Sequence, residues 1–168
     1  IDCNRKREQE LQDATRAMVG KANLFPIASE AKRAKKPGDE KKEKPLILDP
    51  CADEPSEHLR FTEEGHIVPR TKSGRVSKRG EASITVFGLS RIGLVQERAV
   101  CAKVIEKNIA TAQRQKKLLE RHPNDPDIQL EFNEAVKSLR EAAHPRSRYS
   151  AMARQLVEEP LRELGFPL

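Results

Sequence analysis

A long apolar stripe in the C-terminal half constrains the fold most. It consists of Val95, Ala99, Ala102, Ile105, Ile109, Ala112 and Leu119. These steps of three, four and seven residues place the side chains on one face of a helix from about residue 91 to 121, with Lys and Arg on its other faces. The simplest interpretation of this face is a buried core surface, and a groove for a partner protein is the alternative.

A second helix follows almost at once. The segment 122–124, His-Pro-Asn, stops the first pattern, and Asp125 and Pro126 are an N-cap residue and a first-turn proline. The apolar stripe of this helix is Ile128, Phe132, Ala135 and Leu139. Because the connection is short, the two helices are expected to pack antiparallel.

The remaining C-terminal residues and the composition both favour helices. A last helix is expected to start near Ser150, to be interrupted at Pro160 and to end before Gly165. Charged residues make up 35% of the chain and aromatic residues only 4%, with no Trp. A core built from Leu, Ile, Val and Ala suits helix packing better than a β-sandwich, so the expected fold class is mainly α.

The chain begins with a segment whose pattern is weaker. Leu11, Ala14 and Met18 recur at helical steps and Gly20 is placed to end a helix, so residues 4–19 are predicted to be helical. This helix would carry basic residues in its first turn.

The middle of the chain predicts a linker followed by strands and turns. Residues 31–45 are rich in Lys and nearly free of apolar side chains, which indicates a flexible connector. Residues 58–68 alternate polar and apolar around a Glu-Gly turn, which predicts a small β-hairpin. Residues 70–81 are basic and interrupted by Gly and Ser, as in a loop. Residues 82–89 fit either a strand or a short helix ended by Gly88.

Charge and cysteine usage narrow the class of protein. The formal net charge is +6, and a basic surplus attracts polyanions such as nucleic acid. A plain soluble surface is the alternative, since 26 acidic residues are interspersed with 32 basic ones. The three cysteines, Cys3, Cys51 and Cys101, are far apart and odd in number, so no disulfide framework is implied. No apolar run is long enough to cross a membrane, and a cytoplasmic location is expected.

No self-contained catalytic set is visible in the sequence. His58 and His66 fall on the two strands of the predicted hairpin, where they could share a metal, but no Cys or carboxylate ligand stands at a fixed spacing from them. Asp49 and Cys51 could join His58 in a second site. The simpler interpretation is that Asp49 caps the turn after a buried apolar triplet.

A series of short motifs resembles a known family of nucleases. The opening segment is Asp2-Cys3-Asn4-Arg5-Lys6-Arg7-Glu8, and Asn23-Leu24-Phe25-Pro26 follows about 20 residues later. The later motifs are Pro45-Leu46-Ile47-Leu48-Asp49-Pro50-Cys51, Asp53-Glu54-Pro55-x-x-His58-Leu59-x-Phe61, Gly65-x-Ile67-x-Pro69, Gly80-Glu81-Ala82-x-Ile84, Gly88-Leu89-Ser90-Arg91 and Tyr149-Ser150-Ala151-Met152-Ala153-Arg154. In this order they resemble the end of the nuclease core, and the region after it, in HNH-type endonucleases of Septu and retron-associated antiphage defence systems.

The resemblance spans residue 3 to about 157 and implies an organisation of the chain. The helix of a ββα-metal (HNH) motif would begin at Cys3-Asn4, and the strand carrying the general-base histidine would lie upstream of Ile1. The chain is therefore expected to be the C-terminal portion of the nuclease, without its catalytic histidine. The implied parts are the end of the HNH motif (1–30), the Lys-rich linker (31–45), a small mixed segment with the hairpin (46–90) and a helical region (91–168).

The resemblance also implies metal-assisted hydrolysis of DNA phosphodiesters, with Mg²⁺ as the expected ion and a histidine activating water. Asn4 matches a metal ligand or orienting group, Cys3 the last member of a structural Zn²⁺ site, and Arg5, Lys6 and Arg7 a set of DNA-backbone contacts. The alternatives are that Asn4 is only an N-cap, Cys3 only a small buried side chain, and the three basic residues only a solvated first turn.

The implied partners are DNA and an ATPase subunit related to ABC and SMC proteins, in a hetero-oligomer. A competing hypothesis is a non-catalytic helical adaptor that docks a protein partner and touches nucleic acid with the basic loop at residues 70–79. A structural subunit, in which the linker acts as a spacer, is a third possibility.

Overall fold

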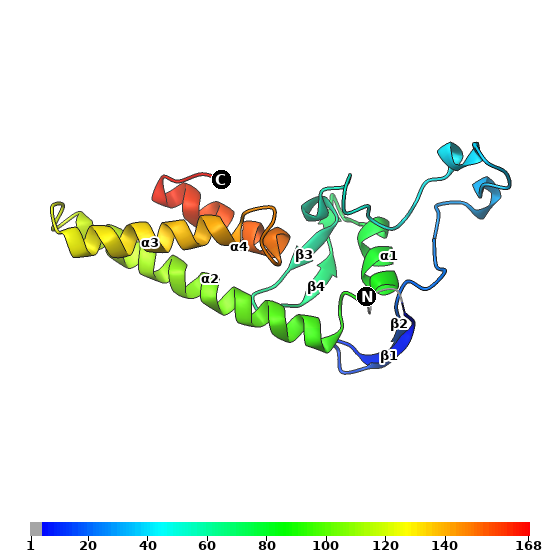
Figure 1. The fold of residues 1–168 in the computed structure, drawn as a ribbon, viewed down its shortest axis with the longest axis horizontal. Helices are drawn as coiled ribbons and strands as arrows, with labels where there is room; N and C mark the ends of the chain where they lie inside the picture. The colour runs from blue at the N-terminus through cyan, green and yellow to red at the C-terminus, as the bar shows by residue number, and fades with distance from the viewer. Residues whose placement is uncertain (1–4) are drawn as a thin grey trace. The chain divides into compact units, whose positions relative to one another are not determined.

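The computed structural model describes residues 5–168, and the chain forms two compact units. The N-terminal unit runs up to Arg60 and resumes at His66–Val95, and the helical unit consists of Phe61–Gly65 and Gln96–Leu168. Within the described residues the fold is mostly helical, with small two-stranded antiparallel sheets in the N-terminal part (Figure 1). The predicted mainly α class is thus confirmed.

The order of elements along the chain is as follows. The strands are β1 (Arg7–Glu10), β2 (Arg16–Val19), β3 (Leu59–Phe61), β4 (Ile67–Pro69), β5 (Thr71–Lys72) and β6 (Arg75–Val76). The short 3-10 helices are η2 (Glu30–Lys32), η3 (Asp39–Lys42) and η4 (Pro55–Glu57). The α-helices are α1 (Lys78–Phe87), α2 (Ile92–Leu119), α3 (Pro126–Ala142) and α4 (Ser150–Leu164).

The first described residues form the β1–β2 hairpin, so the predicted helix over 4–19 is wrong. The register pairs Arg7 with Val19, Glu8 with Met18, Gln9 with Ala17 and Glu10 with Arg16. The carboxylate of Asp13 accepts hydrogen bonds from the N–H (3.1 Å) and hydroxyl (2.7 Å) of Thr15, and Ala14 adopts a left-handed conformation. Such side-chain-to-backbone bonds offer the chain a turn in place of a helix. The expected HNH-motif helix is therefore not formed by its described residues.

The Lys-rich segment has local structure of its own. Its two ends are joined by backbone hydrogen bonds of 2.9 Å, from Ala28 N–H to the Lys44 carbonyl and from Leu46 N–H to the Pro26 carbonyl. The short helices η2 and η3 lie between these ends, in the blue-to-cyan part of the ribbon (Figure 1). The bonded ends close the segment into a loop, and flexible movement of it as a linker stays a prediction.

In the region from β3 to α1, the hairpin predicted at 58–68 is confirmed and the loop predicted at 70–81 is wrong. Strands β3 and β4 pair as predicted for residues 58–68. The predicted loop at 70–81 instead holds the β5–β6 hairpin and the start of α1. Its two-residue turn, Ser73-Gly74, has positive φ at both positions, which matches the twist of a tight hairpin. Residues 82–89 take the helical alternative, and Gly88 ends α1 in the left-handed conformation.

A small core holds the N-terminal unit together. Its buried apolar residues are Val19, Ile27, Ile47, Leu48, Leu59, Ile67, Val86 and Val95. Helix α1 packs on β4. Gly80 allows α1 to approach the residue before β3, because a Cβ there would lie 2.1 Å from the His58 carbonyl oxygen. The buried hydroxyl of Ser83 accepts a hydrogen bond from Leu48 N–H at 2.8 Å. Polar bonds thus supplement a core too small to act alone.

The helical unit follows the sequence prediction closely. Asn108 Nδ2 donates to Ser138 Oγ at 2.9 Å, and Gln115 donates to Glu131, so α2 and α3 run antiparallel. Asp125 caps α3 by accepting from two backbone N–H groups. The shared core contains Ile105, Ala112, Phe132, Ala135, Val136, Leu139, Ala143, Ala153, Val157, Leu161 and Leu164. The apolar stripes predicted for both helices are buried or half-buried.

One prediction for the last helix is wrong. Helix α4 continues through Pro160 to Leu164 and is capped by Gly165. A proline in a helix interior costs about 3 kcal/mol. Val157 and Leu161 on either side of Pro160 are fully buried, so their packing outweighs this cost. None of the helices among residues 5–168 has a span long and apolar enough to cross a membrane.

Candidate functional site

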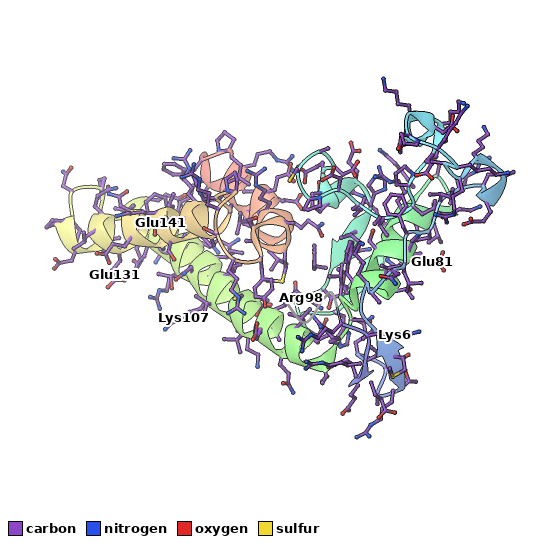
Figure 2. All side chains as sticks on the ribbon, turned by 45° about the vertical axis from the view of Figure 1, so that its right-hand side comes forward. Lys6, Glu81, Arg98, Lys107, Glu131 and Glu141 are labelled. Carbon is purple, nitrogen blue, oxygen red and sulfur yellow. The ribbon has the colours of Figure 1, made fainter. Side chains whose placement is uncertain are left out.

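The predicted catalytic and metal residues, Asn4 and Cys3, lie outside the described residues. The basic residues after them are described: Arg5, Lys6 and Arg7 are all exposed where the chain enters β1. Figure 2 labels Lys6 at this hairpin. The predicted DNA-binding side chains therefore lie on the segment that leads into β1 and on its first residue, and not on the first turn of a helix.

A close backbone contact holds the segment next to Asn4. Gly20 follows β2 with φ of 131°, a conformation that favours glycine. A Cβ at Gly20 would lie 2.1 Å from the Arg5 carbonyl oxygen and 3.0 Å from Lys6 N. The backbone at Arg5 therefore lies directly against the end of β2.

A glutamine side chain ties the β1–β2 hairpin to the rest of its unit. The Gln12 amide donates to the Ile67 carbonyl and accepts from the Ile67 N–H, both at 3.0 Å. The Gln12 N–H donates to the Ser90 carbonyl at 2.9 Å. Gln12 thus joins the hairpin to β4 and to the turn between α1 and α2. Sequence reasoning missed this residue, because nothing local to it signals a partner 55 residues away.

His58 has a structural partner in place of a metal. Its Nδ1 lies 2.8 Å from Ser77 Oγ, and Ser77 is the N-cap of α1, accepting from Gly80 N–H. No group of three or more His, Cys, Asp or Glu side chains that could hold a metal ion occurs among residues 5–168. The geometry therefore favours a role for His58 in positioning α1.

The acidic residues after the apolar triplet build a clamp. Asp49 Oδ1 accepts from Cys51 N–H at 2.8 Å, which confirms its predicted role as a turn cap. Asp53 accepts from Asp49 N–H and binds the Arg79 guanidinium through both oxygens. These hydrogen bonds, chiefly those from Arg79, lower the pKa of Asp53 to about 2. Arg79 also donates to the Ile47 carbonyl at 3.3 Å, which fastens α1 to the triplet.

The basic segment at 70–79 divides into two groups. Arg70 and Arg79 hold the fold: Arg70 donates to the Ser56 carbonyl, while Arg79 binds Asp53. Lys72, Arg75 and Lys78 are exposed on the β5–β6 hairpin and the first turn of α1. Of these two groups, the second is exposed and available to bind a polyanion.

The helical unit contains a buried arginine that the sequence analysis missed. Arg98 is 3% exposed, and its Nε donates to the Gly65 carbonyl at 2.7 Å. Its guanidinium carbon lies 5.9 Å from the centroid of the Phe61 ring, and burial lowers its pKa. Figure 2 labels it on α2. The signal was available, because Arg98 stands on the apolar stripe between Val95 and Ala102.

Comparison with known proteins gives one informative relative. No family model matches the chain, and no solved structure matches it. The Septu protein PtuB of Bacillus mycoides (strain KBAB4) is 40% identical to it over 154 residues, which cover 85% of the chain. The matched region is 51% of PtuB, so the chain spans about half the length of this relative. The chain is therefore a homologue of the Septu protein PtuB, as the order of its sequence motifs predicted.

Proposed function

We propose that this chain is part of a metal-dependent HNH-type DNA endonuclease that works in a Septu antiphage defence system. The observation that carries the proposal is the 40% identity to the Septu protein PtuB over 154 residues. The motifs that carry the resemblance begin at Cys3-Asn4, where the end of the nuclease core is expected.

The proposed chemistry is centred outside the described residues. A divalent ion, Mg²⁺ in this proposal, would stabilise the charge that develops on the scissile phosphate. Residues 5–168 offer no donor cluster that fits such an ion, so the proposal assigns its ligands to Asn4 and to groups outside this range. Cys3 is proposed as a ligand of a structural Zn²⁺.

Residues 5–168 would position this metal centre and bind the DNA. The contact between Gly20 and Arg5 supports the first role, since it fixes the backbone one residue from Asn4. The exposure of Arg5, Lys6 and Arg7 supports the second, because exposed cations bind phosphates and release counterions.

The helical unit is proposed to dock an ATPase subunit related to ABC and SMC proteins. Apolar side chains exposed on this unit support a protein partner: Val100 is 64%, Val104 55% and Leu130 57% exposed. Val100 and Val104 are neighbours on α2, one turn apart. Co-purification of an ATPase with the wild-type protein, lost on replacing Val100 and Val104 with Glu, tests this docking.

The nuclease is tested with the Asn4→Ala variant of the full-length protein, in the presence of its native partner. Cleavage of plasmid DNA is measured with and without Mg²⁺, and phage plating efficiency is measured in parallel. Loss of a metal-side group is expected to lower cleavage about 100-fold. Asn124→Ala, at the exposed turn between α2 and α3, is the matched control. Cleavage that persists in Asn4→Ala contradicts the assignment of Asn4.

A second candidate is a non-catalytic adaptor that contacts nucleic acid. The exposure of Lys72, Arg75 and Lys78 in the basic segment at 70–79 favours it. This hypothesis predicts DNA binding that weakens steeply with salt, and no cleavage by the full-length protein with any divalent ion.

A further inference from the structure

The lysine loop, defined as residues 26–46, carries an excess of positive charge in a closed shape. It contains seven Lys or Arg and four Asp or Glu residues. The antiparallel bridge between Ile27 and Pro45 closes its base. The loop therefore presents its charges from one compact segment, since its two ends are bonded to each other.

Local contacts occupy all four acidic side chains of the loop. Glu30 binds the Arg33 guanidinium through both oxygens, Asp39 accepts from Lys42, Glu40 accepts from Gly38 N–H and Glu43 accepts from Ala34 N–H, at 2.6 to 2.7 Å. Two of these carboxylates, Glu40 and Glu43, accept from backbone N–H groups and form no ion pair with a lysine of the loop.

Five lysines are left without such a partner. Lys32, Lys35, Lys36, Lys41 and Lys44 are exposed, and none forms an ion pair with a carboxylate of the described part of the chain. Like charges this close repel one another, so their clustering costs free energy unless an anion is bound.

The loop also encloses a hollow that these lysines line. The hollow is open and has a volume of about 640 Å³. Lys32, Lys35, Lys41 and Lys44 line it, together with Arg33 and Lys42 and the paired Asp39. An open hollow admits a polymer that continues past it, whereas a small ligand would be better held in an enclosed pocket.

We propose that the lysine loop is a binding site for the phosphodiester backbone of DNA, separate from the basic residues at the start of β1. Lysine ammonium groups act as flexible point charges and lack the rigid fork with which arginine reads guanine. The described lining holds no aromatic ring and no side-chain amide, so it offers no group to stack on or to read a base. The contact is therefore independent of sequence. This proposal rests on the proposed nuclease function, and it gives the DNA substrate a second binding site.

The test compares two triple variants of the full-length protein with equal changes in charge. Lys32, Lys35 and Lys41 are replaced with Gln in one, and Lys103, Lys107 and Lys117, exposed on α2, in the other (Lys107 is labelled in Figure 2). Binding to a random-sequence DNA duplex is measured by fluorescence anisotropy in EDTA between about 50 and 200 mM salt. Each lost phosphate contact reduces the magnitude of the slope of log K against log salt by about 0.9. The slope of the loop variant is therefore expected to be smaller than that of the wild type by about 2 to 3.

The outcomes are distinct. A reduced slope in the loop variant, with the α2 variant close to wild type, supports the site. Equal weakening of both variants shows only a general charge effect and overturns it, as does wild-type binding by the loop variant. Because binding is measured without a divalent ion, the result does not depend on cleavage. A wild-type protein that binds through the loop but cleaves nothing would sink the proposed nuclease and leave this inference standing.

Discussion

The two units of this chain are stabilised in different ways. The helical unit has a continuous apolar core drawn from three helices, in which Leu139, Val157 and Leu161 are fully buried. The N-terminal unit has a smaller set of buried apolar residues, supplemented by single polar bonds such as those of Gln12 and Ser83 to backbone groups far along the chain. The unit that adjoins the candidate site is therefore the one in which single contacts decide the structure.

The largest effect is expected in the helical core. Leu161→Ala should lower the free energy of unfolding by about 3 kcal/mol, because it removes fully buried methyl groups and leaves a cavity. Leu130→Ala is the control, since that side chain is 57% exposed on α3, and its effect should stay within about 0.5 kcal/mol. Urea unfolding measures both. Similar values for the two variants would contradict a core-dominated helical unit.

Gly20→Ala should have the next largest effect. The left-handed conformation and the contact with the Arg5 carbonyl predict a loss of about 1 to 3 kcal/mol of unfolding free energy. In the full-length protein it should also reduce DNA cleavage, because it displaces the backbone beside Asn4. Gly93→Ala is the matched control: no atom lies within 4 Å of a Cβ there, and an alanine on α2 is expected to stabilise slightly. Unchanged stability in Gly20→Ala would refute the close contact.

Gln12→Ala should lower the free energy of unfolding by about 1 to 2 kcal/mol, since it leaves the N–H and carbonyl of Ile67 without this side-chain partner. Gln12→Glu sharpens the test, because a carboxylate can accept from the Ile67 N–H but cannot donate to its carbonyl. An intermediate loss is expected for Glu, measured by urea unfolding, with Gln113→Ala on the exposed face of α2 as control. If both Gln12 variants match the control, the bond to β4 does not hold the hairpin.

The smallest effect is expected at the Asp53–Arg79 clamp. Because folding lowers the pKa of Asp53 to about 2 from an ordinary 3.8, the clamp stabilises the fold fully above about pH 4. That contribution is lost as the pH falls towards about 2. The urea midpoint of the wild type should therefore drop more steeply over this range than that of Asp53→Asn. Parallel curves would show that the clamp adds nothing to stability.

Sequence reasoning succeeded where the signals were local. The caps at Asp125 and Gly165 and the stripes of α2 and α3 depend on residues within a few turns of one another, and these elements formed as predicted. The β3–β4 hairpin was predictable for the same reason, since its strands are joined by a short turn.

Tertiary contacts decided the rest. Residues 7–19 have a weak helical spacing, yet they form a hairpin because Gln12 bonds to Ile67 and Ser90, and because Gly20 lies against Arg5. Helix α4 passes through Pro160 for a similar reason, since the buried residues beside it pack against α3. The position of Asn4 relative to a metal or to DNA stays a prediction. Periodicity and capping depend on near neighbours, so the sequence alone determined the long helices, whereas a short, polar segment takes the conformation that its distant partners stabilise.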